Sequence, residues 1–189
     1  NTNNNEIDVL QLSTSTIVLD KVGRGSDGGE LVVGGMSSNG ENVWDGGSGS
    51  KGIQRFNVTV EGDATQPSDL ASLRSTHNTL EEVVVRGTGG ASLTIGNSNT
   101  VGVAPNEGAS IENGNGSTGV TTILNTALKD VRLFDATALT SSVEVHGYLS
   151  DEVVAKYMDL TDEQANPAGD NADFVYNLTA GNDTLNMSL

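Results

Sequence analysis

Short runs of β-branched and apolar residues recur along the chain and constrain its fold more than any other feature. They lie at 7–12, 16–19, 31–33, 53–60, 80–85, 92–95, 121–124, 131–134, 143–145, 174–178 and 184–189. Such runs favour extended strands. The segments between them are rich in glycine and asparagine, which supply the positive φ angles that tight turns require. We therefore expect an all-β fold.

Two segments instead predict short helices. SDEVVAKYMDL begins with Ser150, and Val153, Val154, Tyr157 and Met158 then follow at helical spacing. SDLASLRS begins with Ser68 directly after a proline. A serine at either position can cap the first helical turn.

Three of the runs share a pattern: IQRFNVTV from Ile53, LEEVVVRG from Leu80 and LKDVRLFD from Leu128 are apolar at their first, fourth and sixth positions. A strand–turn unit of this size cannot bury its apolar face alone, whereas stacked units can. We therefore predict an irregular parallel β-solenoid, or β-helix, with one or two short helices. The third positions then form an outward row across the stack: Arg55, Glu82 and Asp130. An antiparallel β-sandwich uses the same strands and turns and is the alternative.

The chain divides into two parts by composition. Residues 1–51 hold the N-terminal strands and a glycine-rich loop that contains Trp44, and residues 52–189 hold the solenoid-like repeat block. The chain opens on NTNNN and closes within a strand-like run. Natural domains rarely leave such an edge unprotected, so we expect a piece of a longer chain.

The charge balance excludes several classes of partner. The chain has 25 acidic and 9 basic residues, a net charge of −16, which argues against nucleic acid and against an anionic membrane surface. It suits solubility, divalent cations or a cationic partner. Because the chain has no cysteine, disulfides and thiolate zinc sites are excluded. No apolar run is long enough to span a membrane.

Three segments carry oxygen ligands of the kind that calcium prefers. TAGNDTLNM offers Asn182 and Asp183 as calcium ligands. The alternative interpretation of this segment is a simple β-turn before the last strand. The other candidates lie in PAGDNADF and GRGSDGGE: Asp170, Asn171, Asp173, Asp27 and Glu30. Neither of these two segments has EF-hand spacing.

Catalytic chemistry is not indicated. His77 and His146 are the only histidines, and the sequence near them supplies no triad. We therefore predict no catalytic residue. A carboxylate pair for glycoside hydrolysis stays open, because the chain has many acidic residues.

Longer phrases carry a resemblance. NTLEEVVVRG, SLTIG, ALKDVRLFDATALTSSVEVHG and DFVYNLTAGNDTL resemble the repetitive surface proteins of Gram-negative bacteria, the S-layer proteins and RTX-type adhesins exported by type I secretion. The resemblance covers about 52–189. It implies an extracellular location at the bacterial cell surface, calcium-assisted folding and assembly into a lattice or fibre. Asp183 is the one position onto which a family ligand maps.

The expected function is that of a self-assembling structural module of a bacterial surface layer or filament. Its partners would be copies of itself or neighbouring domains. The alternative is a ligand-binding module of a large secreted adhesin, in which Trp44 meets a surface glycan or a protein. A second alternative is a carbohydrate-active β-helix enzyme.

Overall fold

The structure is a computed structural model that describes residues 12–23, 28–34, 52–96, 101–102, 122–123, 127–151, 153–154 and 174–188. Most of the regular structure in these residues is strand and almost none is helix, which confirms the all-β class. The elements are β1 Thr14–Asp20, β2 Glu30–Val33, β3 Arg55–Glu61, β4 Ser68–Leu70, β5 Ser72–Ser75, η1 Thr76–Asn78, β6 Glu82–Gly87, β7 Leu93–Ile95, β8 Val101–Gly102, β9 Thr122–Ile123, β10 Leu128–Lys129, β11 Leu133–Leu139, β12 Val143–Tyr148, β13 Val175–Asn177 and β14 Thr184–Ser188.

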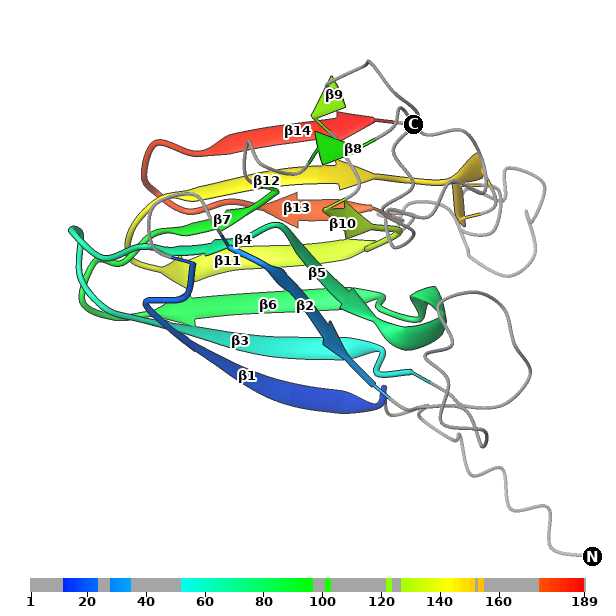
Figure 1. The fold of residues 1–189 in the computed structure, drawn as a ribbon, viewed down its shortest axis with the longest axis horizontal. Helices are drawn as coiled ribbons and strands as arrows, with labels where there is room; N and C mark the ends of the chain where they lie inside the picture. The colour runs from blue at the N-terminus through cyan, green and yellow to red at the C-terminus, as the bar shows by residue number, and fades with distance from the viewer. Residues whose placement is uncertain are drawn as a thin grey trace, which may run out of the picture.

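The strands form two larger sheets and two small ones (Figure 1). The first sheet has the order β1-β3-β6-β11-β13, and the second has the order β10-β12-β7-β4, with β14 also on β12. β2 pairs with β5. All of these pairs are parallel, and only β8 and β9 run antiparallel among the named strands. An antiparallel sandwich is therefore not the architecture of the described residues.

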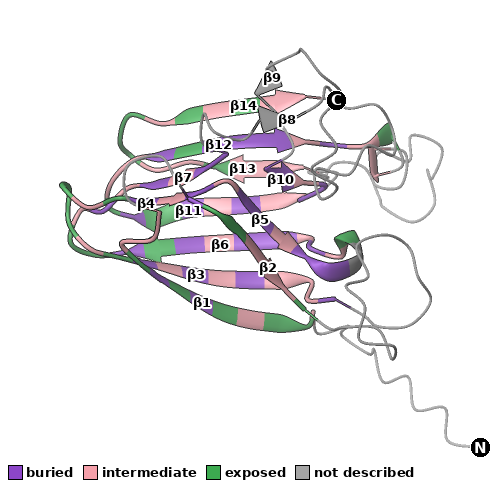
Figure 2. Cartoon of the chain, viewed as in Figure 1, coloured by how far each residue is buried: buried purple, intermediate pink, exposed green. Residues whose placement is uncertain are grey.

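Strand alternation explains how the core fills. In the first sheet Phe56, Val83 and Phe134 lie opposite one another, and all three are fully buried. In the second sheet Ile95 and Val145 do the same. Successive side chains of a strand point to opposite faces, so buried and half-buried residues alternate from Arg55 to Val60 along β3, and buried residues alternate with more exposed ones from Val83 to Gly87 along β6 (Figure 2). Each fully buried large apolar side chain contributes about 1.5–3 kcal/mol through removal of its surface from water.

The predicted repeat is correct for two of its three segments. Arg55 pairs with Glu82, so the segments from Ile53 and Leu80 lie in the expected register. The predicted register of the third segment is wrong by three residues, because Glu82 lies opposite Leu133 and not opposite Asp130.

The reason for this shift lies at Asp130, whose φ of 58° turns the chain between two sheets. Leu128 precedes that turn, in β10 of the second sheet, while β11 of the first sheet begins after it. The apolar positions of the third segment match those of the other two, but the segment crosses from one sheet to the other at this turn. Leu80 and Leu128 still pack into one core cluster, against which Ile53 packs.

The helix predicted from Ser68 is also wrong. The segment forms β4 and β5, which pair with β7 and β2. Leu70 and Leu73 are both buried there, so sheet pairing overrides a weak local preference. Ser150 does begin a helical turn: the backbone N–H of Val154 donates to its carbonyl over 2.9 Å, and that of Val153 to its hydroxyl over 3.4 Å.

Strands on both sides of the predicted boundary between residues 51 and 52 share sheets. β1 pairs with β3 over its whole length, and β2 pairs with β5. The N-terminal strands thus contribute Ile17 and Leu19 to the common core.

Candidate functional site

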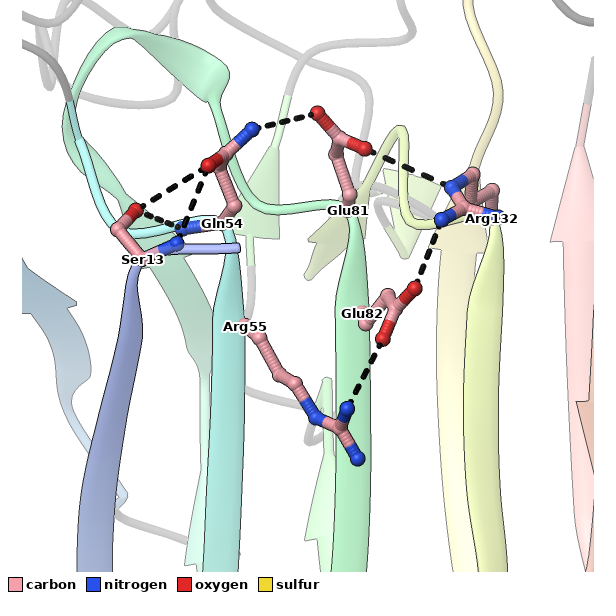
Figure 3. Close-up of polar contacts among 6 residues, drawn as sticks. All are labelled: Ser13, Gln54, Arg55, Glu81, Glu82 and Arg132. Atoms are coloured by element: carbon pink, nitrogen blue, oxygen red, sulfur yellow. Dashed lines mark hydrogen bonds and ion pairs between the residues drawn. The ribbon is translucent and has the colours of Figure 1, made fainter. Parts of the chain in front are cut away.

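A chain of polar side chains crosses the outer face of the first sheet at the start of its strands (Figure 3). Its centre is Glu82 on β6, whose side chain is 11% exposed. One carboxylate oxygen lies 2.7 Å from a guanidinium nitrogen of Arg132, and the other lies 3.6 Å from Arg55 on β3. Glu82 thus joins the strand starts on both sides of β6.

The row of polar contacts continues from Glu82 toward β1 through neighbouring residues. Arg132 also reaches Glu81, with 3.5 Å between its Nε and the carboxylate. The amide of Gln54 donates to Glu81 over 3.2 Å, and its oxygen accepts from the backbone N–H of Ser13 over 3.2 Å. These contacts link four strands of the sheet where each one begins, which favours one register over its neighbours.

The predicted outward row is therefore partly correct. Arg55 and Glu82 do pair across neighbouring strands. The third member is Arg132 and not Asp130, which is a correction that follows from the register of β11. Sequence reasoning missed Gln54, Glu81 and Arg132. The signal available for them was a polar or charged residue just before each strand.

Asp130 instead fills a buried corner. One of its oxygens accepts from the backbone N–H of Ser150 over 2.7 Å, and the other accepts from the amide of Asn78. Lys129 lies 4.0 Å from the same carboxylate. These contacts hold η1, β10 and the helical turn together at one corner.

The phenol of Tyr176 lies beside that corner and donates to the carbonyl of Val131. Burial, together with the negative charge of Asp130, raises the pKa of Tyr176 well above its ordinary value. At the turn after β3, hydrogen bonds from the side chain and backbone of Thr65 lower the pKa of Asp63. Both contacts support the fold and show no reactive arrangement.

His146 lies on β12 between β7 and β14. One ring nitrogen lies 2.8 Å from the carboxylate of Glu144, and the other lies 3.5 Å from the amide of Asn186 on β14. The ring covers Gly96, where φ is +99° and an added Cβ would lie 2.7 Å from the Cβ of His146. His146 therefore packs against the end of β7 and is buried, on the same face of β12 as Glu144.

Two predicted calcium ligands are engaged in other contacts. One oxygen of Asp183 accepts from the backbone N–H of Val143 over 2.9 Å and from the hydroxyl of Thr179 over 2.7 Å. Glu30 forms an ion pair of 2.8 Å with Arg74. Asn182 is exposed in the turn before β14. Within the described ranges, no three His, Cys, Asp or Glu side chains are grouped to hold a metal.

Several predicted positions lie outside the described residues: Asp27, Asp170, Asn171, Asp173 and Trp44. The calcium and ligand-contact predictions for them stay predictions.

The outermost strands are the remaining candidate site. Across the described part of the chain, β1 pairs only with β3, β13 only with β11, and β14 only with β12. An outermost strand presents unpaired backbone N–H and C=O groups along one side. Such an edge can bind another extended strand through main-chain hydrogen bonds.

The comparisons add no relative. No family model, curated protein or solved structure matches the chain. The described residues contain no helix long and apolar enough to cross a membrane.

Proposed function

We propose that the chain is a parallel β-solenoid and that it serves as a self-assembling structural module of a bacterial cell-surface layer or filament. The observation that carries the proposal is the parallel, in-register return of the chain to the first sheet by β1, β3, β6, β11 and β13. From β3 onward the chain passes through the second sheet after each return: as β4 after β3, as β7 and β10 after β6, as β12 after β11, and as β14 after β13. Alternation between two sheets in a fixed order is what a coiled chain produces.

The side chains support the same reading. Phe56, Val83 and Phe134 stack through three layers as one buried row. On the outer face, Arg55, Glu82 and Arg132 connect the same layers by charge. Each layer contacts only its neighbours in such a structure, so long insertions can leave from the corners without disturbing the stack.

A stack of this kind suits a mechanical and organising role. Its main-chain hydrogen bonds run along the stacking direction, with about 4.8 Å per layer. In the described part of the chain, β1, β13 and β14 each pair with a strand on one side only, and the other side of such a strand can pair with a further strand. A neighbouring domain or a second copy can extend the sheets at these ends.

Calcium is part of the proposal and is supported by the net charge of −16. Clustered carboxylates repel one another, and a hard divalent cation reduces that repulsion. Because Asp183 and Glu30 are engaged elsewhere, binding would rest on the other acidic segments. The extracellular location follows from the same proposal and from the resemblance to surface proteins.

The experiment is to follow assembly of the purified chain by sedimentation and electron microscopy, with calcium and with chelator. Sheets or filaments are expected with calcium. A chain that stays monomeric at high concentration under both conditions would overturn the proposal. No described residue favours the adhesin or the enzyme alternative.

A further inference from the structure

Three outermost strands, β1, β13 and β14, lack nearly all of the charges that normally protect edge strands. Soluble proteins place charged residues, prolines or bulges on open edges to prevent association. β13 and β14 contain no charged residue and no proline, and β1 carries one charge, Asp20, at its last position. The inner strand β3, in contrast, carries Arg55 and Glu61. In a chain of net charge −16, these three strands carry almost none of the charge that would repel a second copy.

The core also continues into the last layer, where the described residues cover it less completely. Tyr176 lies opposite Phe134, and Leu185 lies opposite Val145. Phe134 and Val145 are fully buried, whereas Tyr176 and Leu185 are only partly buried, although both pack against the core. A further layer on this side would bury them as the inner layers bury their counterparts.

From these observations, and resting on the proposed function, we infer that copies of the chain stack head to tail, with β1 of one copy parallel to β13 of the next. The occupant of the open edge is thus a second copy, and the contact continues the sheet that β1, β3, β6, β11 and β13 already form.

The polarity follows from the direction of the strands. A two-fold axis that keeps the core on one side of the sheet would bring β13 antiparallel to β13 of a second copy. Head-to-tail stacking instead repeats the parallel pairing found at each internal layer of the first sheet. Such a contact is heterologous and leaves one open edge at each end of the assembly, so it grows into a filament and does not stop at a dimer.

The register within the chain predicts which residues meet. One outward row runs along the whole first sheet: Thr16, Asn57, Val84, Asp135 and Asn177. Continuing that row across the contact places Thr16 of one copy beside Asn177 of the next. Within one copy the same two residues are four layers apart, about 19 Å, so they cannot be bridged intramolecularly.

The test uses the absence of cysteine from the chain. The double variant Thr16→Cys, Asn177→Cys is allowed to assemble, oxidised and run on a denaturing gel without reductant. A ladder of dimers, trimers and higher species is expected. Each single variant should run as a monomer on this gel. The matched control Thr16→Cys, Thr184→Cys should also run as a monomer, because Thr184 lies in the second sheet.

The remaining outcomes separate this inference from the proposed function. Dimers of the single variant Asn177→Cys would show two-fold pairing and overturn head-to-tail stacking. Assembly seen by sedimentation without any crosslink would overturn the inference and keep the self-assembling module. No assembly and no crosslink would overturn both. A second variant, Asn177→Lys, adds a charge to the edge and should remain monomeric while keeping the wild-type melting curve.

Discussion

Replacing Glu82 with glutamine tests the polar chain on the first sheet. The carboxylate is 11% exposed and lies between Arg55 at 3.6 Å and Arg132 at 2.7 Å. Exposed ion pairs contribute about 0.2–1 kcal/mol each. Both arginines are about one-third exposed, so solvent screens them, while the buried carboxylate places both pairs toward the upper end. We expect Glu82→Gln to lower the free energy of unfolding by about 1–2 kcal/mol, or the melting temperature by about 2–8 °C.

The control must separate this local loss from the effect of overall charge. Glu82→Gln changes the net charge from −16 to −15, which relieves repulsion and stabilises slightly. Glu61→Gln changes the charge equally at the exposed end of β3, where the described residues provide no ion pair. Urea unfolding of both variants at low and high salt provides the measurement. Equal stabilities of the two variants, or a difference that does not shrink at high salt, would refute the reasoning.

The other predictions concern the core, a corner, a buried phenol and calcium. Phe134→Ala should cost about 3–5 kcal/mol in urea unfolding, because the ring is fully buried; a loss below about 1 kcal/mol would show that the row is not packed. Gly96→Ala should destabilise by about 1–3 kcal/mol because its φ is +99° and its new Cβ meets His146, whereas Gly29→Ala has open space and should be near neutral. Because folding raises the pKa of Tyr176, the contribution of its protonated phenol to stability is full below pH about 10 and is lost as pH rises above that value. The variant Tyr176→Phe should therefore lose less stability at alkaline pH than the wild type, and an equal loss would contradict this prediction. Calcium should raise the melting temperature relative to chelator, and an unmoved curve would remove calcium from the account.

Much of the strand pattern could be predicted because alternation is local. Thr16–Leu19, Leu31–Val33 and Val143–Val145 all fall within observed strands. The pairing of the segments that begin at Ile53 and Leu80 was also predictable, because their shared apolar positions lie opposite one another in adjacent strands of one sheet. The local alternation of residues and one repeat were therefore enough to predict many of the strands and one strand pairing.

The misses share a physical cause, since a corner is set by backbone conformation and not by apolar spacing. Asp130 turns the chain with a φ of 58°, so a matching pattern from Leu128 crossed from one sheet to another. Likewise, Ser68 has a capping side chain, but its backbone pairs with β7. The polar chain through Arg132 depends on the resulting register, so it could not be predicted before the register was known.

Cysteine pairs within one chain measure most directly whether the strands of the first sheet lie in parallel, in-register layers. Asn57 lies opposite Val84 on the outer face, and Thr59 lies opposite Arg86. The variant Asn57→Cys, Val84→Cys should form an intramolecular disulfide on oxidation, because adjacent strands are about 4.8 Å apart. The variant Asn57→Cys, Arg86→Cys separates the same strands by two further residues, about 8 Å in all, and should stay reduced. A disulfide in the second variant but not in the first would contradict the stacked register.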